Sequence, residues 1–319
     1  MPNHGTWGAE GTAERFRALH MIRLDNALSE VVAELAASGQ RAILLKGPSF
    51  ADWLYDDRWQ RTYQDIDLAV DPATFDQSEQ VLARMGFTLR PGSRHHTVWQ
   101  RGPVTIELHR SLYWTRCGDQ LAWEILSAET SELLICGRPV ETLGPPGRLV
   151  VVCLHAAQHG RDFPHPLADL TRSIARVNRH DWKRAAELAR RLGAIEPFGA
   201  GLRMCPEGEV LAQALSIPQA RSREIALLAH APPPTAVGFE QLATAERARD
   251  RLRLIVDELL PSAAFMRSWQ PLARRGWLGL AAAYGWRPFW LLAKAPRGLR
   301  VWLAAHREYK RGARGRWRG

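Results

Sequence analysis

The chain has 319 residues, of which 46% are hydrophobic, and it carries a formal net charge of +10. This length and composition allow about two domains with hydrophobic cores of their own. The four cysteines show no paired spacing and no secretory leader is visible, which argues against a disulfide framework and predicts a reduced, cytoplasmic protein. The longest uncharged apolar stretch, residues 276–286, is too short to span a bilayer.

The chain is predicted to begin with a short tail, a helix and a strand. Residues 1–12 are small and polar, which is typical of a disordered segment. Residues 13–38 have the apolar stripe of an amphipathic helix that Gly39 ends. A buried strand is then predicted over residues 42–45.

The end of this strand carries candidates for phosphate binding. Lys46 is followed by Gly47, and Pro48 suits the first position of a new helix. The free N–H groups and the dipole at such a helix start attract anions. We therefore expect Lys46, Gly47 and the hydroxyl of Ser49 to contact phosphates. The alternative for Lys46 is a solvated cation at the end of a strand.

Two carboxylates stand one residue apart in the next predicted strand, residues 63–70. Side chains alternate along a strand, so Asp65 and Asp67 share one face. Anions this close repel each other unless a cation lies over them, and Mg²⁺ prefers oxygen ligands and bridges to phosphates. The pair indicates metal-assisted nucleotidyl or phosphoryl transfer, although acids that simply face water would show the same pattern. Arg61 either neutralises a phosphate, braces the pair or lies on the surface.

A third carboxylate follows on a later strand. After a helix, further strands are predicted, the last over residues 104–109. Glu107 and His109 share one face of this strand. With Glu107 as a third carboxylate, Asp65, Asp67 and Glu107 are candidate ligands of two metal ions. His109 either orients a ligand, contacts substrate, acts as a base or bonds to the backbone.

Strands of mixed direction without repeated βαβ alternation predict a small α+β core. A hairpin is expected over residues 133–143, and the run of glycines and prolines at 144–147 marks a boundary. The predicted organisation is a disordered N-terminus (1–12), a catalytic domain (13–145), an all-helical domain (146–231), and a linker with a basic, tryptophan-rich helical tail (232–319).

The helical domain carries two histidines on one helix face. His155 and His159 are spaced i, i+4, as in zinc-binding helices, but the glutamate of the zinc-protease motif is missing. From the residues alone, the alternative to zinc binding is that neighbours such as Asp169 satisfy both histidines.

The C-terminal tail concentrates the positive charge. Residues 261–319 contain thirteen arginines and lysines and a single acid, Glu308, and six of the 13 tryptophans. We favour helices packed on the core with some interfacial character. The alternatives are a helix on an anionic membrane surface, or a polyanion-binding arm, for which no nucleic-acid-binding fold is visible.

These motifs together resemble a known family. Lys46-Gly47, Tyr55, Arg61-x-x-x-Asp65-Ile66-Asp67-Leu68, and an acid followed two residues later by His109 are similar to the uncharacterised nucleotidyltransferase family of the polymerase-β-like superfamily. The resemblance extends to His155-x-x-x-His159 and Asp169 and covers about residues 15–180. It implies that this helix face closes over the active site, where His155, His159 and Asp169 would contact substrate or phosphates. The chain departs from the superfamily pattern in one respect: Lys46-Gly47-Pro48-Ser49 replaces the usual Gly-Gly or Gly-Ser pair and lies further upstream.

The resemblance and the motifs together predict an Mg²⁺-dependent transferase. It would move a nucleoside monophosphate from ATP or another nucleoside triphosphate to a hydroxyl or phosphate acceptor. Asp65, Asp67 and Glu107 would hold two Mg²⁺ ions, while Lys46, Gly47, Ser49 and Arg61 would bind the nucleotide. The alternatives are kinase-like phosphoryl transfer from the same site, or a non-catalytic scaffold whose tail binds a membrane or polyanion. The predicted location is the cytoplasm, with peripheral contact to a membrane through the tail.

Overall fold

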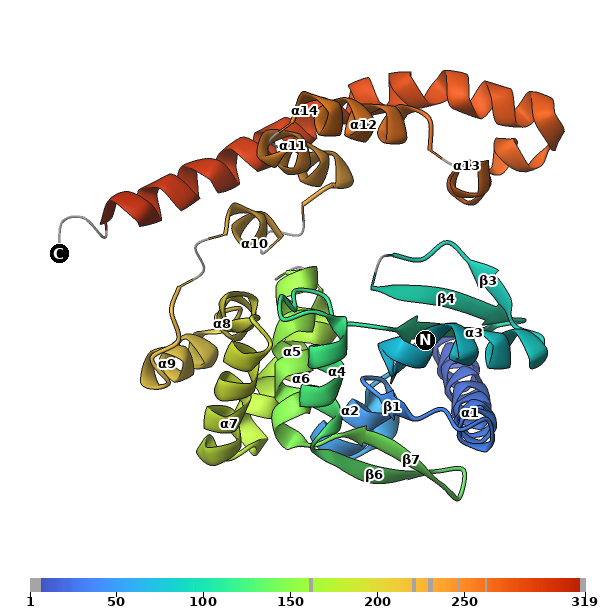
Figure 1. Cartoon of the computed structure of the whole chain (residues 1–319), viewed down its shortest axis with the longest axis vertical. Helices are drawn as coiled ribbons and strands as arrows, with labels where there is room; N and C mark the ends of the chain where they lie inside the picture. Colours follow the sequence, from blue (N-terminus) through green and yellow to red (C-terminus); the bar gives the residue numbers. More distant parts are fainter. Residues whose placement is uncertain are drawn as a thin grey trace, which may run out of the picture.

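The computed structural model describes residues 7–93, 95–160, 163–219, 222–228, 232–245, 247–261 and 263–315 (Figure 1). Helix α1 (Trp7–Ala37) begins the described chain. The predicted disordered N-terminus thus differs over residues 7–12, which are helical. Its first six residues lie outside the described ranges.

Seven strands form one mixed sheet in the order β3-β4-β5-β2-β1-β7-β6. β2 is antiparallel to β1 but parallel to β5, and β1 is parallel to β7. The outer neighbours β3–β4, β4–β5 and β6–β7 are antiparallel. The strands are β1 (Ala42–Leu44), β2 (Ile66–Val70), β3 (Thr88–Arg90), β4 (His96–Arg101), β5 (Val104–His109), β6 (Thr130–Ile135) and β7 (Arg138–Leu143).

The alternation of side chains along β2 divides the core into two layers. Ile66, Leu68 and Val70 point to a cluster that includes the apolar stripe of α1 and buried residues of α3 (Phe75–Arg84). Asp67 and Ala69 point to the opposite face, where Ala69 packs against the cluster built on the helical region. The carboxylates of β2 are thus turned towards the helices that follow the sheet.

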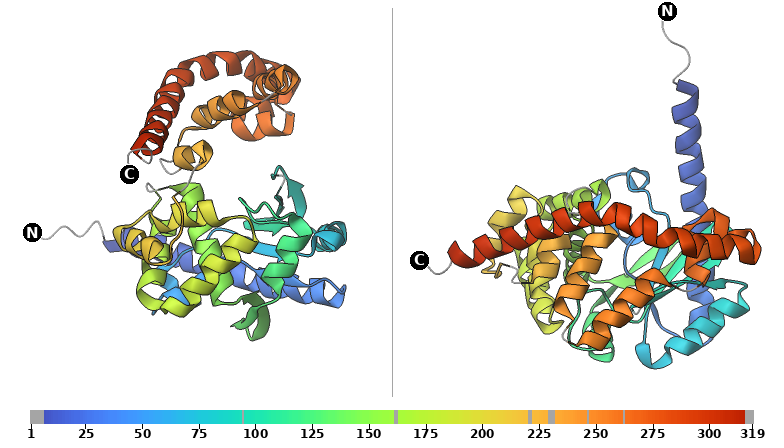
Figure 2. Two further views of the ribbon diagram at one scale, coloured as in Figure 1. Left: turned by 60° about the vertical axis from the view of Figure 1, so that its left-hand side comes forward. Right: turned by 90° about the horizontal axis from the view of Figure 1, so that it is seen from above.

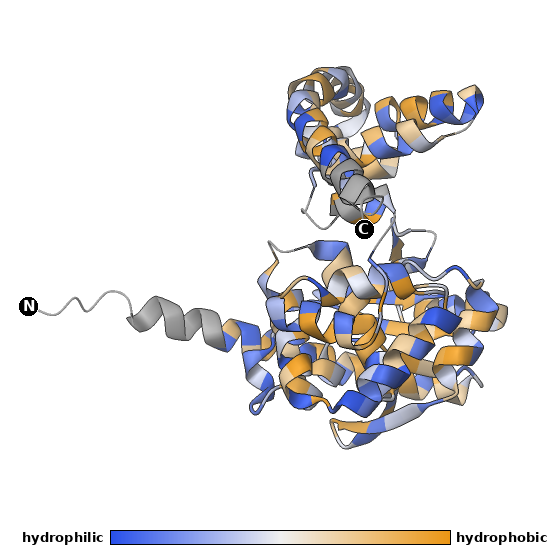
Figure 3. Ribbon diagram, turned by 90° about the vertical axis from the view of Figure 1, so that its left-hand side faces the viewer, coloured by the Kyte–Doolittle hydropathy of each residue, from blue (hydrophilic) through white to orange (hydrophobic). Residues whose placement is uncertain are grey.

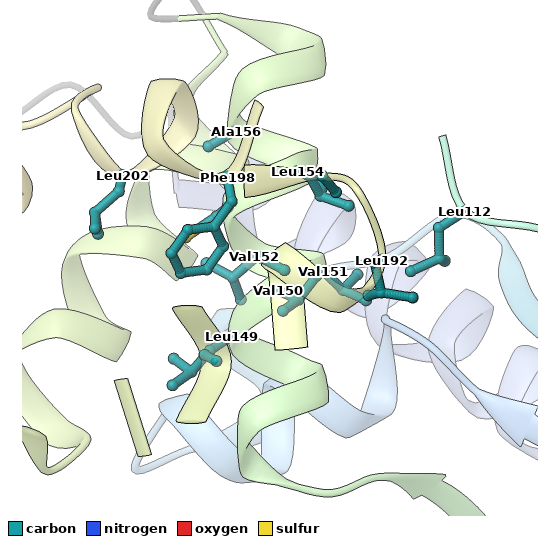
Figure 4. Packing of buried hydrophobic residues seen from close by; sticks show 14 of the residues in the cluster. Leu112, Leu149, Val150, Val151, Val152, Leu154, Ala156, Leu192, Phe198 and Leu202 are labelled. Atoms are coloured by element: carbon teal, nitrogen blue, oxygen red, sulfur yellow. The ribbon is translucent and has the colours of Figure 1, made fainter. Parts of the chain in front are cut away.

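Helix α5 (Pro145–His159) is the centre of that second layer. It follows β7 directly and buries a nearly continuous apolar run, Leu149–Leu154, against α7 and α8 (Figure 4). The surrounding helices are α2 (Pro48–Leu54), α4 (Asp119–Ser127), α6 (Pro164–Arg176), α7 (Arg179–Arg191), α8 (Ile195–Leu202) and α9 (Pro206–Ala214). Because α5 is apolar nearly all round, it forms the core between the sheet and α6–α8.

The last five helices form a separate layer above the core in two views (Figures 1 and 2). Helix α10 contacts α5 and α8 on one side and α11 and α14 on the other, so it links the two parts. Helix α14 continues through Pro288 and Pro296. The helices are α10 (Arg223–Leu228), α11 (Pro234–Thr244), α12 (Ala248–Leu259), α13 (Ala263–Trp269) and α14 (Gly276–Gly315).

The fold confirms an α+β class with a mixed sheet followed by a largely helical region. The charged, amphipathic pattern of residues 240–260 predicts one helix there, but the structure divides it: α11 ends at Thr244, and Ala245 is extended. The Thr244 hydroxyl donates to the Glu240 carbonyl and so competes with the helical backbone bonds at this end. Within the described ranges, no helix combines the length and apolarity needed to cross a membrane.

Candidate active site

A cavity of about 440 Å³ lies where the end of β1, strands β2 and β5, and the last turn of α5 meet. Its lining is dominated by titratable side chains. They are Lys46, Arg61, Asp65, Asp67, His95, His96, Glu107, His109, His155, His159 and His165. Six of the chain's 11 histidines therefore surround three carboxylates and one lysine.

The carboxylates are brought together by parallel pairing of two strands that are far apart in sequence. In the register of β2 and β5, Asp67 is the direct neighbour of Glu107. Asp67 is only 2% exposed, whereas Glu107 and Asp65, which precedes β2, are half-buried. All three of these predicted metal ligands line the one cavity.

Two basic side chains contact Asp67. Lys46 Nζ lies 2.9 Å from Asp67 Oδ1, and His109 Nε2 lies 3.1 Å from the same oxygen and 3.5 Å from Glu107 Oε2. Burial disfavours the charge on Asp67, but Lys46 and the bond from His109 outweigh it and lower its pKa. Burial likewise works against charge on His109, whereas its bonds to Asp67 and Glu107 raise its pKa.

Asp65 has a different environment from Asp67. Burial and the neighbouring Asp67 raise the pKa of Asp65 to about 6, although Lys46 acts in the opposite direction. Asp65 is therefore the carboxylate whose charge is compensated least by the protein's own cations.

Gly47 places Lys46 over the acids. Its φ of +62° is a left-handed conformation that favours glycine, and a Cβ there would touch the ring of Tyr63. The expected anion site at the start of α2 has few donors, because the N–H groups of Ser49, Phe50 and Ala51 donate to the carbonyls of Lys46 or Gly47. Helix α2 also has only seven residues.

Ser49 lies away from the cavity lining. Its hydroxyl is buried and is 2.6 Å from the hydroxyl of Thr142, which in turn donates to the Leu44 carbonyl. Ser49 therefore links the start of α2 to β1 and β7.

Arg61 and Asp169, predicted as separate ligand contacts, are bound to each other. The guanidinium donates from Nε and Nη2 to both carboxylate oxygens of Asp169, with distances of 2.7–3.0 Å. Tyr55 donates a further bond of 2.8 Å to Asp169. Asp169 is 1% exposed, and its bonds join the segment before β2 to α6. Arg61 also donates to the Gly47 carbonyl and reaches the cavity.

The two histidines of α5 face the carboxylates across the cavity. Their rings contact each other at a centroid distance of 4.6 Å. Burial and the charge of Lys46 hold the pKa of His155 well below its usual value, so His155 is neutral. Its Nδ1 is buried without a hydrogen-bond partner in the described part of the chain, which is uncommon for a buried polar atom.

Comparison with known proteins identifies the family of this chain. Residues 12–207 match the model of a family described as uncharacterised nucleotidyltransferase. The chain belongs to this family. The expected kind of enzyme, a nucleotidyltransferase, is therefore confirmed at the level of the family.

Solved structures with a similar arrangement include the solution structure of the antibiotic-resistance factor ANT(2'')-Ia, with a TM-score of 0.40, 14% identity, and coverage of 54% of this chain and 96% of that one. A crystal structure of an antigenic nucleotidyltransferase-like protein from Paracoccidioides brasiliensis has a TM-score of 0.39 and 17% identity, and the match covers 62% of this chain and 94% of that one. The crystal structure of ANT(2")-Ia in complex with adenylyl-2"-tobramycin has a TM-score of 0.35 and 14% identity, and the match covers 60% of this chain and 96% of that one. No curated protein matches the sequence significantly.

In this nucleotidyltransferase-family chain, His96 is a site residue that was not predicted. Its Nε2 lies 3.9 Å from Glu107 Oε2, and ligand atoms of His96, Glu107 and His109 all lie within 4.8 Å of one another. The sequence nevertheless contains a signal for His96. When the two strands are paired residue by residue from the turn at 101–104, His96 lies opposite His109. Tyr63 and Gln158 also line the cavity and were not predicted.

The carboxylates of the cavity suit a hard divalent cation by their chemistry, although the three ligand atoms that converge within 4.8 Å in the described part of the chain are those of His96, Glu107 and His109. Three carboxylates face one cavity, and their oxygens are the ligands that Mg²⁺ prefers. Lys46 and His109 both contact Asp67, while Asp65 keeps a raised pKa that a bound cation would lower. Negative charge thus remains for a cation to neutralise.

Proposed function

We propose that this protein transfers a nucleoside monophosphate from a nucleoside triphosphate to a hydroxyl or phosphate acceptor. The observation that supports this most directly is the register of β2 and β5, which puts Asp67 beside Glu107 at the cavity wall with Asp65 two residues away. Membership of a nucleotidyltransferase family favours this chemistry over other uses of clustered carboxylates.

Asp65, Asp67 and Glu107 would hold two Mg²⁺ ions. When bound, Mg²⁺ would neutralise phosphate charge and make the acceptor hydroxyl more acidic. Asp67 suits this role because Lys46 and His109 keep it ionised. Glu107 is half-buried in the cavity and would take the proton from the acceptor.

The remaining charges would bind the triphosphate and orient the carboxylates. Lys46 lines the cavity with its side chain one-fifth exposed and would bind a phosphate there. Arg61 contributes positive charge at the cavity, but its bond to Asp169 fixes it there. The neutral His155 and its neighbour His159 would contact the nucleotide or the acceptor from α5.

The test uses the purified protein with Mg²⁺, each nucleoside triphosphate and a cell extract, followed by mass spectrometry for new adducts. Nucleotidyl transfer adds a nucleoside monophosphate to the acceptor and releases pyrophosphate. Release of a nucleoside diphosphate with addition of a phosphoryl group would instead support the kinase-like alternative.

Site variants connect the activity to the carboxylates. Asp67→Asn and Glu107→Gln should each lower turnover at least about a hundredfold. The matched control is Glu132→Gln, on the exposed edge strand β6, which should keep wild-type turnover. Circular dichroism confirms that each variant is folded. Wild-type turnover in either site variant would disprove the assignment.

A further inference from the structure

We infer that the first half of α14 docks on the surface of a bilayer that contains anionic lipid. Five large apolar side chains of this segment are 52–76% exposed: Trp277, Leu278, Trp286, Phe289 and Leu292. Leu278, Phe289 and Leu292 follow the helical period and lie on one side of the helix. A row of this kind on one side of a surface helix has no partner within the described part of the chain.

Charge is absent from this side of the helix. Between Gly276 and Pro296 the charged residues are Arg287 and Lys294. Arg287 is 3% exposed and pairs with Glu258 of α12, so it points into the helical layer. The residues between the exposed apolar side chains on the same side are small. The patch is therefore a continuous apolar surface rather than scattered hydrophobic residues.

A groove extends the patch towards α11 and α12. It has a volume of about 380 Å³ and is lined mainly by apolar side chains, among them Phe239, Leu254 and Leu291. Ile255 and Leu292 are both exposed and also line the groove, so the groove opens onto the surface of α14. Figure 3 shows hydrophobic stretches on these helices beside strongly hydrophilic ones.

Basic side chains flank the patch at both of its ends. Arg274 and Arg275 are exposed before it, and Arg297 and Arg300 are exposed after it. With thirteen basic residues and one acid over residues 261–319, the segment attracts an anionic surface. Basic residues at the edge with tryptophan and phenylalanine between them are typical of a helix lying in the headgroup region.

The arrangement favours a bilayer over other occupants. A second copy of the chain would bring its own arginines against these arginines, and like charges oppose such an interface. Nucleic acid is bound through phosphates and base stacking, which gives no role to exposed Leu278 and Leu292. Because the exposed apolar row runs along one side of α14, the helix would lie parallel to the surface.

The experiment is flotation of the full chain with vesicles of phosphatidylcholine containing about one-third phosphatidylserine, compared with phosphatidylcholine alone. The wild-type protein should float with the anionic vesicles, and much less with the neutral ones. Phe289→Ser with Leu292→Ser should weaken the partition at least about tenfold, because their apolar area stays in water. Arg297→Gln with Arg300→Gln should weaken it at least about fivefold on anionic vesicles alone.

Matched variants separate the patch from general surface effects. Leu134→Ser with Val210→Ser removes two equally exposed apolar side chains elsewhere, and Arg15→Gln with Arg17→Gln removes the same charge from α1. Both pairs should float like the wild-type protein.

Three results would overturn the inference. The first is failure of the wild-type chain to float with anionic vesicles. The second is flotation of the Phe289→Ser, Leu292→Ser variant equal to that of the wild-type protein, which would indicate that the tail binds polyanions in general through its charge. The third is a wild-type dimer in light scattering that becomes a monomer in that variant, which would show a second copy on the patch. None of these results bears on the proposed transferase activity.

Discussion

At the scale of single residues, Asp65 and Asp67 have the same side chain, but the pKa of Asp65 is raised and the pKa of Asp67 is lowered. Asp67 is enclosed by Lys46 and His109, which make its ionised form favourable despite burial. Asp65 is partly buried beside the charge of Asp67, with no cation in hydrogen-bond contact among the residues that the structure describes, and its pKa rises to about 6. Two carboxylates with separated pKa values in one cavity are typical of sites that bind metal ions or move protons.

The raised pKa of Asp65 predicts a pH-dependent cost in stability. Between about pH 4 and 6 the Asp65 carboxyl keeps its proton in the folded protein but has released it in the unfolded chain. The free energy of unfolding therefore falls as pH rises through this window. Without divalent metal, Asp65→Asn should remove this fall and stabilise the protein at pH 7 by at most about 3 kcal/mol. Urea unfolding of both proteins at pH 4 and 7 in the presence of EDTA measures these free energies of unfolding.

The control for this prediction is Asp76→Asn, which changes an exposed acid in α3. It should leave the difference in free energy of unfolding between pH 4 and 7 unchanged. If Asp65→Asn shows the same pH dependence as the wild-type protein, Asp65 has an ordinary environment and is not part of a crowded carboxylate cluster.

At the scale of elements, the strands with local partners were predictable and the distant pairings were not. The β4–β5 hairpin follows from the turn at 101–104, and the alternation in β2 correctly puts Asp67 opposite Ile66 and Leu68. Parallel pairing of β2 with β5 involves residues about 40 positions apart, and no local pattern encodes it. The Arg61–Asp169 bond spans 108 positions, and therefore both residues looked like independent ligand contacts.

This buried ion pair should stabilise the junction between the sheet and α6. Asp169→Asn removes a buried anion and leaves the guanidinium of Arg61 without compensation, which should cost about 3–5 kcal/mol of unfolding free energy. The matched variant is Asp56→Asn, whose ion pair with Arg176 is exposed and should cost at most about 1 kcal/mol. Chemical denaturation compares them. Equal, small losses would show that the pair does not hold this junction.

At the scale of the whole molecule, the family match and the C-terminal helices occupy different parts of the chain. The match ends at residue 207, at the start of α9, whereas α10–α14 lie beyond it and contact the core through α10. We propose that residues 232–315 form an addition that positions a nucleotidyltransferase core. One small apolar cluster around Ala283 lies wholly within it, and a second around Ala305 also includes Leu227 of α10. Such an addition should unfold locally without disturbing the sheet.

Arg287 provides the test, because it is the buried charge that ties α14 to α12 and α13. Its guanidinium donates to Glu258 at 2.8 Å and lies 5.0 Å from the ring centroids of Phe265 and Trp269. Arg287→Ala should remove these contacts and raise amide hydrogen exchange in α12–α14 by about tenfold or more, while β2 and β5 keep their protection. Arg297→Ala, an exposed change on the same helix, should leave exchange unaltered. Faster exchange in β2 and β5 of the Arg287 variant would show that the C-terminal helices and the sheet unfold together, and that the tail is part of the core's own stability.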